Sequence, residues 1–590
     1  MKILLCCTSI EDGHRSEDVH DTHYPLGLAY LQSYLEKHRP EKDEFVNLYL
    51  NNIPYDESFK TLKRELKNLK PDVFGVSMMT HSRVSAFRAI EYAHQRYPKM
   101  KIVVGGMHPT VMWEQIARKF PYIVVCRGEG EVTFKNIIDL YEKDGDIREV
   151  EGIAVYDQDT DEVFTTGNAP LIEDLDTLPF PKHELFVTQG KTMANLLTSR
   201  GCPYRCNFCV LDWMSKRQVR FRSGGNIADE IEMLLDKYPS IRTIWIHDDA
   251  FMINNDRTIE FCDAIIERGI KTQFVASARF RPISHEVVFK MKQAGFVQVL
   301  FGLESGAAEV IKGMRKGISK EHARYGLELF SKTGMKATAF IIVGLPGETE
   351  DTIEETIDFV QQLQDIDYLY YEDIGTAMLY PGTEMYTQCR ETGLIDDDYW
   401  LSDGDIPYYT KEFGGVHSME TLNKFKKTIQ EGISLKYLFT REHFLKQRKL
   451  IPKILQYSQR FPLGNLNQLL PEIIAHNNLT PALLQSLFLR SNDDLIKHIS
   501  SLWEQTIVNQ IINSDEPMTK EDREKFIQDW ISQVAKDEEW LLKCEEQMKE
   551  VRAKLENVKD VGDVEYKKKA EKSGLEVKQL DFKISTMGGV

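Results

Sequence analysis

Several features of membrane, secreted and nucleic-acid-binding proteins are missing or scarce in this sequence. No apolar run approaches the ~18 residues of a membrane span. The opening stretch Met1–Cys7 is too short for a signal peptide, whose central region needs roughly 7 to 15 apolar residues. Basic blocks are missing too, and 74 Lys and Arg against 91 Asp and Glu leave a net charge of −17. We therefore expect a cytoplasmic protein with no membrane span and no broad binding to nucleic acid.

Cysteine is also scarce, and its distribution is uneven. Nine cysteines in 590 residues are too few for a disulfide scaffold, and an odd number leaves one unpaired. Six are scattered, whereas Cys202, Cys206 and Cys209 stand within eight residues. Thiols stay free in a reducing compartment, so this group is expected to hold metal rather than to form a disulfide.

Residues 1–148 alternate strand-like runs with amphipathic stretches such as 59–68 and 82–96. This alternation predicts an α/β domain with a parallel, doubly wound, flavodoxin-like sheet. In such a sheet, ligands lie beyond the carboxyl ends of the strands. The expected strands are Lys2–Cys7, Phe45–Leu50, Val73–Ser77, Lys101–Val104 and Ile123–Cys126.

The loops at those strand ends are rich in glycine, which lets a ligand approach the backbone because no Cβ stands in the way. Ordinary turns use glycine as well, so the loops alone leave open whether they bind a ligand. The residues concerned are Ser77, Gly105, Gly106, His108, Gly128, Glu129 and Gly130.

Residues 149–190 are expected to be a connector, since the prolines in Leu178–Pro181 interrupt a helix. Alternation resumes over residues 191–412, where six βα units predict a complete or partial barrel with its chemistry at the carboxyl ends of the strands. Residues 413–590 have a helical period. Their heptad seam from Leu541 to Leu555, which includes Cys544, is interpreted as ordinary helix packing. The six strands are expected at Asn195–Thr198, Thr243–His247, Gln273–Ser277, Gln298–Leu303, Lys336–Val343 and Tyr368–Thr376.

The three grouped cysteines follow the first expected strand of the barrel. Three thiolates on one loop can hold three irons of a [4Fe-4S] cluster and leave the fourth iron open, whereas electron-transfer clusters take four cysteines. Zinc is the main alternative, but a structural zinc site needs a fourth Cys or His. The next cysteine, Cys262, lies far along the chain within a helical pattern. We therefore favour an iron–sulfur cluster.

The pattern Cys-x3-Cys-x2-Cys, with Phe208 before the last cysteine, resembles the signature of the radical S-adenosylmethionine (SAM) superfamily. In that family the amino and carboxylate groups of SAM chelate the open iron, and reductive cleavage yields a 5′-deoxyadenosyl radical. The resemblance implies an electron donor such as ferredoxin or flavodoxin, and it implies that Arg279 pairs with the SAM carboxylate. A helix cap is the alternative interpretation of Asp248 and Asp249. The SAM contacts that the resemblance implies are Phe208, Asp248, Asp249, Arg279, Glu304, Ser305 and Gly344.

The glycine-rich loops of the first domain resemble the cobalamin-binding domain that is fused to many radical SAM enzymes. Cobalamin domains similar to methionine synthase carry Asp-x-His-x-x-Gly, whose histidine coordinates cobalt, but Asp21–Gly27 has one residue too many for this pattern. We therefore expect cobalt without a lower histidine ligand, with His23 on the surface and His108 as a loop or cofactor-edge residue. The cobalamin contacts that the resemblance implies are the seven strand-end residues named above, from Ser77 to Gly130.

These resemblances imply a cobalamin-dependent radical SAM methyltransferase that methylates an unactivated carbon through a deoxyadenosyl radical and methylcobalamin. The same domains suit an oxidative cyclase or rearrangement enzyme without methyl transfer, as in porphyrin ring formation. A non-catalytic cobalamin or metal sensor is a third hypothesis, and methylthiolation of transfer RNA would need a second cysteine trio. The substrate stays open among small molecules, lipids, porphyrins and peptides. Tyr371 and Glu372 are candidates for lining its site, together with Tyr380 and Thr383.

Overall fold

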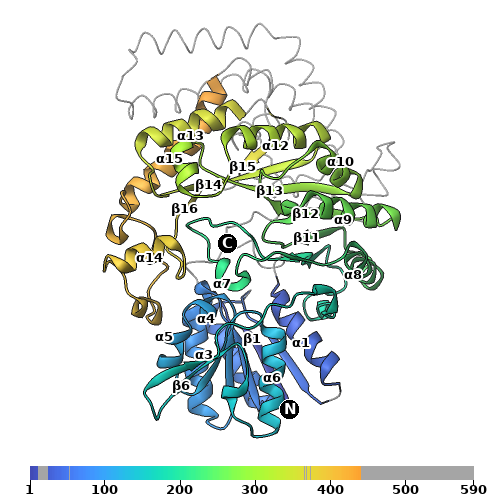
Figure 1. The fold of residues 1–590 in the computed structure, drawn as a ribbon, viewed down its shortest axis with the longest axis vertical. Coiled ribbons are helices and arrows are strands. Elements are labelled where there is room, and N and C mark those ends of the chain that lie inside the picture. Colours follow the sequence, from blue (N-terminus) through green and yellow to red (C-terminus); the bar gives the residue numbers. More distant parts are fainter. Residues whose placement is uncertain are drawn as a thin grey trace, which may run out of the picture. The chain divides into compact units, whose positions relative to one another are not determined.

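Two parallel sheets organise the chain, one in each half of the region that the computed structural model describes (Figure 1). That region is residues 1–439 without 11–23, 41, 52, 364–365, 367–368 and 372–373. Its elements up to Ile433 belong to one compact unit. Three features expected from the sequence fall outside the described residues, namely His23, Glu372 and the heptad seam with Cys544.

The first sheet has the strand order β2-β1-β3-β4-β5-β6-β7, and its first five strands are parallel. This is the flavodoxin-like order, in which the direction of winding reverses between β1 and β3. The expected doubly wound sheet is therefore confirmed. The strands are β1 (Lys2–Cys7), β2 (Glu44–Tyr49), β3 (Val73–Ser77), β4 (Lys101–Gly105), β5 (Ile123–Cys126), β6 (Ile153–Asp157) and β7 (Glu162–Thr165).

Strands β6 and β7 lie in the stretch that the sequence suggests as a connector. They extend the sheet as an antiparallel edge beyond β5. Strand β1 is a continuous apolar run, and each of its residues after Lys2 is buried. This is the pattern of a central strand in a parallel sheet that is covered on both faces.

Helices cover both faces of this sheet (Figure 1). Helix α1 packs beside α6 and α2 packs beside α3. In α2 the buried residues Leu62, Leu66 and Leu69 recur at helical spacing, which is why this segment forms an amphipathic helix against the sheet. The helices are α1 (Leu26–His38), α2 (Tyr55–Leu69), α3 (Arg83–Arg96), α4 (Met107–Val111), α5 (Trp113–Lys119) and α6 (Gly130–Glu142).

The second sheet is an open half-barrel in the order β15-β14-β13-β12-β11-β8, with β16 paired to β14. All of these pairings are parallel, which confirms the partial barrel. The single strand expected over 368–376 is instead two short strands. The strands are β8 (Met193–Leu196), β11 (Thr243–Ile246), β12 (Gln273–Ala278), β13 (Phe296–Glu304), β14 (Lys336–Val343), β15 (Leu369–Tyr371) and β16 (Gly375–Thr376).

The helices of the half-barrel begin at polar caps. In each of five helices a Ser, Thr or Asn side chain accepts a hydrogen bond from a backbone N–H of the first turn, which fixes where the helix starts. Helix α15 (Met419–Phe439) follows the half-barrel. The capped helices are α8 (Gly224–Lys237), α9 (Asn255–Glu267), α10 (His285–Ala294), α12 (Lys320–Thr333) and α13 (Glu350–Gln362).

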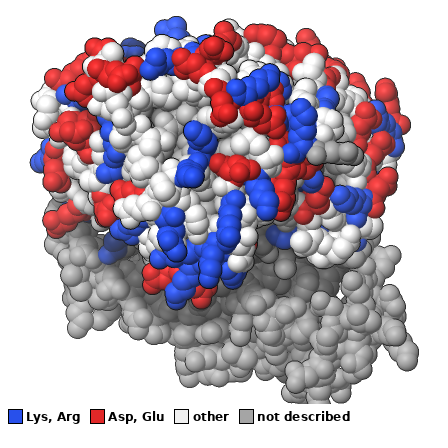
Figure 2. Space-filling view, turned by 90° about the horizontal axis from the view of Figure 1, so that it is seen from below, with Lys and Arg blue, Asp and Glu red and all other residues white. Residues whose placement is uncertain are grey.

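The surface of the described region is charged. Figure 2 shows it from the side at which β1 begins, where Lys and Arg side chains are interspersed with Asp and Glu. None of the helices in the described region is both long enough and apolar enough to span a membrane.

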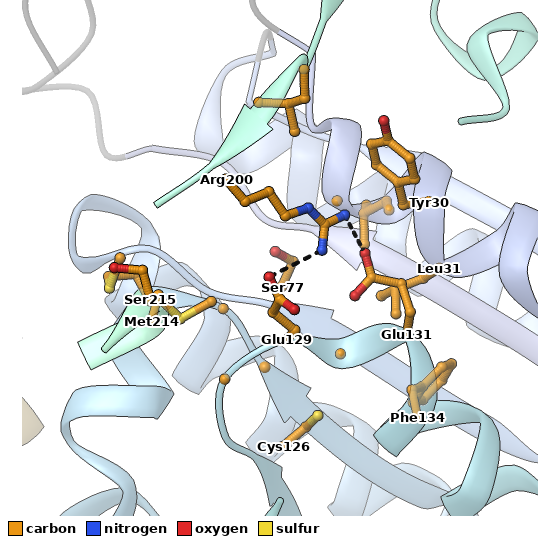
Figure 3. Close-up of a pocket in the computed structure, with 18 of the residues that line it drawn as sticks. Tyr30, Leu31, Ser77, Cys126, Glu129, Glu131, Phe134, Arg200, Met214 and Ser215 are labelled. Carbon is orange, nitrogen blue, oxygen red and sulfur yellow. Dashed lines mark hydrogen bonds and ion pairs between the residues drawn. The ribbon is translucent and has the colours of Figure 1, made fainter. Parts of the chain in front are cut away.

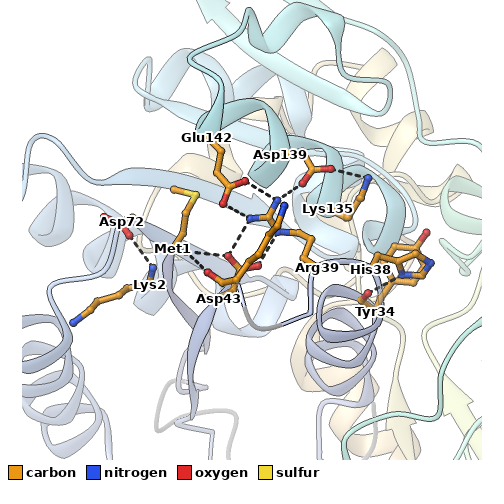
Figure 4. A network of polar contacts seen from close by, with 11 residues as sticks. Met1, Lys2, Tyr34, His38, Arg39, Asp43, Asp72, Lys135, Asp139 and Glu142 are labelled. Carbon is orange, nitrogen blue, oxygen red and sulfur yellow. Dashed lines mark hydrogen bonds and ion pairs between the residues drawn. The ribbon is translucent and has the colours of Figure 1, made fainter.

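A buried ionic network joins the ends of α1 and α6 (Figure 4). The Arg39 side chain is 1% exposed, and its guanidinium donates to Asp43 at 2.7 Å, to Glu142 at 2.6 Å and to Asp139. Burial raises the pKa of Asp43, but the hydrogen bonds and charges of Arg39 and the N-terminal ammonium together outweigh burial, so that this pKa lies below its usual value. Arg39 is therefore the counter-charge for three carboxylates.

We predict that Arg39→Met lowers the free energy of unfolding by about 3 kcal/mol, because it removes the buried charge that these carboxylates share. Asp43 then keeps the N-terminal ammonium and Asp139 keeps Lys135 as the remaining cations. Denaturant unfolding at neutral pH measures the loss. Asp43 has a lowered pKa in the folded state, so its contribution is present above pH of about 4 and is lost as the pH falls through that pKa. The matched control is Arg148→Met, which removes an exposed pair with Asp157 and should cost less than about 1 kcal/mol. Equal losses in the two variants would contradict this account.

Candidate functional site

A cavity of about 360 Å³ lies where the carboxyl ends of the first sheet face residues that follow β8 and β11 (Figure 3). Both halves of the described chain line it. The second half contributes Gly201, which directly precedes Cys202, and also His247 and Asp249. From the first half, six of the strand-end residues singled out in the sequence line the cavity: Ser77, Gly105, Gly106, Gly128, Glu129 and Gly130.

Glycines shape the wall and the floor of this cavity. Gly106 has φ +104°, and a Cβ there would lie 2.7 Å from the Met78 carbonyl oxygen, so only glycine suits this turn. A Cβ on Gly27, in the first turn of α1, would meet no atom within 4 Å. Gly27 therefore opens onto free space in the cavity.

Two arginines and two glutamates line one side of the cavity. We call them the arginine–glutamate cluster: Arg200, Arg220, Glu129 and Glu131. The arginines stand on the hairpin of β9 (Ser199–Arg200) and β10 (Arg220–Phe221), and the glutamates stand at the start of α6. Arg220 contacts both oxygens of Glu129 at 2.8 Å, a bidentate pair. Arg200 lies between the glutamates, 2.7 Å from Glu131 and 3.3 Å from Glu129 (Figure 3).

The cluster determines the charge of Glu129. Burial raises the pKa of this carboxyl, but the hydrogen bonds from Arg220 and the charge of Arg200 outweigh burial and hold the pKa below its usual value. Glu129 also accepts a hydrogen bond from the Ile172 N–H. Its carboxylate thus binds the two halves of the chain together, although its residue lines the cavity.

His108 takes a different place from the other strand-end residues. It is 1% exposed, its Nδ1 lies 3.2 Å from the Thr80 hydroxyl, and its ring packs against Trp400. Burial and the charge of Arg83 lower the pKa of His108 to about 3, so the ring is neutral. His108 does not line the cavity, and in the described part of the first half no other histidine does.

The cysteine loop follows β9. Cys202, Cys206 and Cys209 are half-buried, and Phe208 packs against the core. Burial raises the pKa of Cys209 to about 11. The described residues contain no group of three or more His, Cys, Asp or Glu side chains in a metal-binding arrangement. The set of donors nevertheless fits a cluster held by three thiolates on one loop.

Arg279, just beyond β12, lies over this loop. Its Nη1 is 3.6 Å from the Cys206 Sγ, and its guanidinium stacks on the Tyr204 ring at 3.5 Å from the centroid. Its Nε and Nη2 are buried and have no hydrogen-bond partner in the described part of the chain. Two unfilled donors on one guanidinium suit a carboxylate.

The adjacent residues Asp248 and Asp249, which follow β11, make different contacts. Asp248 accepts hydrogen bonds from the backbone and the hydroxyl groups of Thr198 and Ser199, at 2.6 Å from the Thr198 N and the Ser199 Oγ. Asp249 accepts one from the Gly201 N–H at 3.0 Å and lines the cavity. Burial raises the pKa of Asp249 to about 6, against the opposing effect of the Gly201 hydrogen bond. Only Asp249 is placed to meet a ligand in the cavity.

The next strand ends hold the remaining residues that the resemblance singled out. Glu304 ends β13 and pairs with Lys316, and Ser305 is buried against the Thr356 hydroxyl. Gly344 follows β14 with φ +86° and donates its N–H to the buried Glu348 carboxylate. Because β13 lies between β12 and β14, Arg279, Glu304 and Gly344 share one edge of the sheet.

The substrate-lining candidates hold structural contacts. The Tyr371 hydroxyl donates to the Val360 carbonyl oxygen at 3.4 Å, and Thr383 is buried and caps α14 (Glu384–Glu391). Tyr380 lies 3.1 Å from the His81 ring. Sequence reasoning did not single out Arg200, Arg220 or Lys316, because a buried cation has the same local pattern as a surface one.

Comparison with known proteins agrees with these two halves. Residues 17–138 match the B12 binding domain, and residues 196–360 match the Radical SAM superfamily. The chain is 30% identical over 406 residues to an uncharacterized methyltransferase of Pyrococcus horikoshii. The aligned region covers 68% of this chain and 85% of the methyltransferase. It is 29% identical over 390 residues to the anaerobic magnesium-protoporphyrin IX monomethyl ester cyclase of Cereibacter sphaeroides, covering 63% of this chain and 61% of the cyclase.

Solved structures show the same fold. The cobalamin-dependent SAM radical enzyme OxsB, solved with aqua-cobalamin and SAM bound, has a TM-score of 0.61 at 18% identity, covering 97% of this chain and 83% of OxsB. The radical SAM methyltransferase TsrM from Kitasatospora setae has a TM-score of 0.56 at 18% identity, covering 66% of this chain and 76% of TsrM. The chain therefore belongs to the B12-binding radical SAM enzymes, whose cofactors are a [4Fe-4S] cluster, SAM and cobalamin.

Proposed function

We propose that this enzyme is a cobalamin-dependent radical SAM methyltransferase that acts on an unactivated carbon. The observation that carries the proposal is the shared cavity. It brings the glycine-rich loops of the B12-binding half into the same space as Gly201 and Asp249, which adjoin the cysteine loop. A methyl donor held by one half and a radical formed at the other could then meet one substrate. The identity to a methyltransferase of Pyrococcus horikoshii supports this choice.

We assign the cluster and SAM to the strand ends of the half-barrel. Cys202, Cys206 and Cys209 are the proposed cluster ligands, and the two unfilled N–H donors of Arg279 bind the SAM carboxylate. When bound, the cluster supplies the electron that cleaves SAM, and cobalamin supplies the methyl group. The protein binds, orients and excludes water. Asp248 holds the turn from which the cysteine loop begins, and Asp249 faces the bound groups.

We assign cobalamin to the cavity, over Ser77, Gly105, Gly106, Gly128 and Gly130. That cobalt has no lower histidine ligand stays a prediction, because His14, His20 and His23 fall outside the described residues. An electron donor such as flavodoxin and a reducing, cytoplasmic setting suit a cluster held by thiolates.

The second candidate is an oxidative cyclase. The 29% identity to the cyclase of Cereibacter sphaeroides favours it specifically, since that relative combines similar sequence with ring formation. The substrate class therefore stays among small molecules, lipids, porphyrins and peptides in this proposal. A non-catalytic sensor is disfavoured because the cysteine trio and the Arg279 donors are both present.

We predict that the reduced, fully loaded enzyme transfers the methyl group of SAM to its cobalamin. Under strict anaerobiosis, methyl-labelled SAM should give labelled methylcobalamin, detected by absorbance and mass spectrometry without any substrate. Cleavage of SAM to 5′-deoxyadenosine with no labelled methylcobalamin would favour the cyclase.

The same assay tests the cluster ligands. Cys206→Ala should abolish formation of 5′-deoxyadenosine and lower the bound iron, whereas Cys262→Ala, a buried thiol of α9, should retain both. Undiminished cleavage by the Cys206 variant would refute the cluster assignment.

We predict that Gly27→Leu weakens cobalamin binding about tenfold or more, because the side chain grows into the cavity that the cofactor needs. Cobalamin retained after gel filtration, measured by absorbance, reports the effect. Gly27→Ala adds one methyl group with free space around it and should bind almost normally. An unchanged affinity in the Leu variant, with an unchanged unfolding temperature, would place cobalamin elsewhere.

A further inference from the structure

The charges around the cysteine loop differ from those of the chain as a whole. Over the chain, Asp and Glu outnumber Lys and Arg by 91 to 74. Residues 199–223, 279–282 and 312–317 reverse this balance, with eleven Lys and Arg against a single acid, Asp212. Some of these cations are buried and make the contacts described above. The exposed ones need a separate explanation.

The three segments meet at the cysteine loop. The Asn207 backbone N–H donates to the Met314 carbonyl oxygen, and the Asn207 side chain donates to the Gly313 carbonyl oxygen, both at 3.2 Å. The Tyr204 hydroxyl donates to the Arg281 carbonyl oxygen at 3.3 Å. The cysteines of this loop are themselves only half-buried. The basic segments therefore border a loop that solvent can reach.

A groove of about 460 Å³ lies in the third segment, between α11 (Ala308–Gly313) and the start of α12. Three cations line it, Lys312, Arg315 and Lys320, against one carboxylate, Glu321. The Arg315 side chain is 60% exposed even within its ion pair. Lys312 is exposed and forms no ion pair with any described residue. The groove thus presents positive charge to solvent.

Positive charges gathered on one surface repel one another, so they do not stabilise the fold. They do speed the arrival of a partner that carries the opposite charge. The adjoining cysteine loop is where we place a cluster that has to be reduced, and each cleavage of SAM consumes one electron. The basic surface therefore borders the point at which electrons enter the enzyme.

We propose that this surface is the docking site of an acidic electron-carrier protein, an inference that rests on the proposed function. The basic docking surface consists of Arg205, Arg281, Lys312 and Arg315, all of which are exposed. In each encounter the carrier is oxidised by one electron and the cluster is reduced by one electron, with no bond made or broken. Carboxylates on the carrier pair with the four cations and hold its redox group beside the cysteine loop.

The first test measures binding without turnover. A flavodoxin of net negative charge, kept oxidised, is titrated into the full chain loaded with cluster and cobalamin, and calorimetry gives the Kd. The double variant Arg205→Glu with Lys312→Glu should weaken binding about tenfold or more at low salt, because attraction becomes repulsion at two positions. High salt should weaken binding to the wild-type chain and reduce the difference between the two proteins, because it screens exposed charges.

Two further variants separate docking from net charge and from damage to the cysteine loop. Lys60→Glu with Lys67→Glu changes the net charge equally at exposed positions of α2, and it should leave the Kd unchanged. Lys312→Glu alone lies outside the cysteine loop and should give an intermediate loss of affinity. Iron content should stay unchanged in every variant.

The second test compares two reductants in the formation of 5′-deoxyadenosine. Reduced flavodoxin must dock, whereas reduced methyl viologen is a small cation that a basic surface does not attract. With limiting flavodoxin, the double variant Arg205→Glu with Lys312→Glu should be about tenfold slower than the wild type. With methyl viologen, the two proteins should react at the same rate.

Four results would overturn the inference: a wild-type chain that does not bind flavodoxin, unchanged flavodoxin affinity in the double variant, equal weakening in the α2 control, or equal loss of rate with both reductants. Failure of the proposed function gives a different result. The wild-type chain would then form no 5′-deoxyadenosine with methyl viologen, whatever its affinity for flavodoxin.

Discussion

The pairing of Arg200 and Arg220 with Glu129 and Glu131 is the interaction on which the cavity depends. It joins the hairpin that leads into the cysteine loop to the loop at the start of α6, so the two halves meet with their strand ends facing one space. The four side chains are largely buried, and each charge has an opposite partner. Loss of Glu129 would remove the carboxylate that Arg220 contacts, and loss of Arg200 would remove the arginine that Glu131 contacts.

Much of the fold could be predicted because its signals are local. The bounds of β1, β3, β5 and β14 follow directly from apolar runs. Two features could not be read in this way. Strands β6 and β7 join the first sheet through pairing with β5, which depends on tertiary contact. The described residues within 368–376 form two short strands, β15 and β16, where the sequence suggests one.

The site was predictable in its loops rather than in its contacts. Glycines at strand ends can be recognised in the sequence, and six of the seven residues singled out there line the cavity. The partner of a charged side chain cannot be recognised in this way. Arg220 and Glu129 are 91 residues apart, and nothing near either residue indicates the other. His108 shows the same limit: its loop sequence suggests a ligand contact, whereas burial beside Trp400 and the charge of Arg83 lower its pKa and keep the ring neutral.

Asp248 and Asp249 show how one dipeptide can divide two tasks. Successive residues leaving a strand point to opposite sides. The Asp248 carboxylate accepts hydrogen bonds from four donors of the Thr198–Ser199 turn, and the Asp249 carboxylate lines the cavity. Asp248 holds the Thr198–Ser199 turn in place, whereas the Asp249 side chain lines the cavity. Two identical neighbouring residues thus have different roles in the fold: Asp248 stabilises a turn, and Asp249 forms part of the cavity wall.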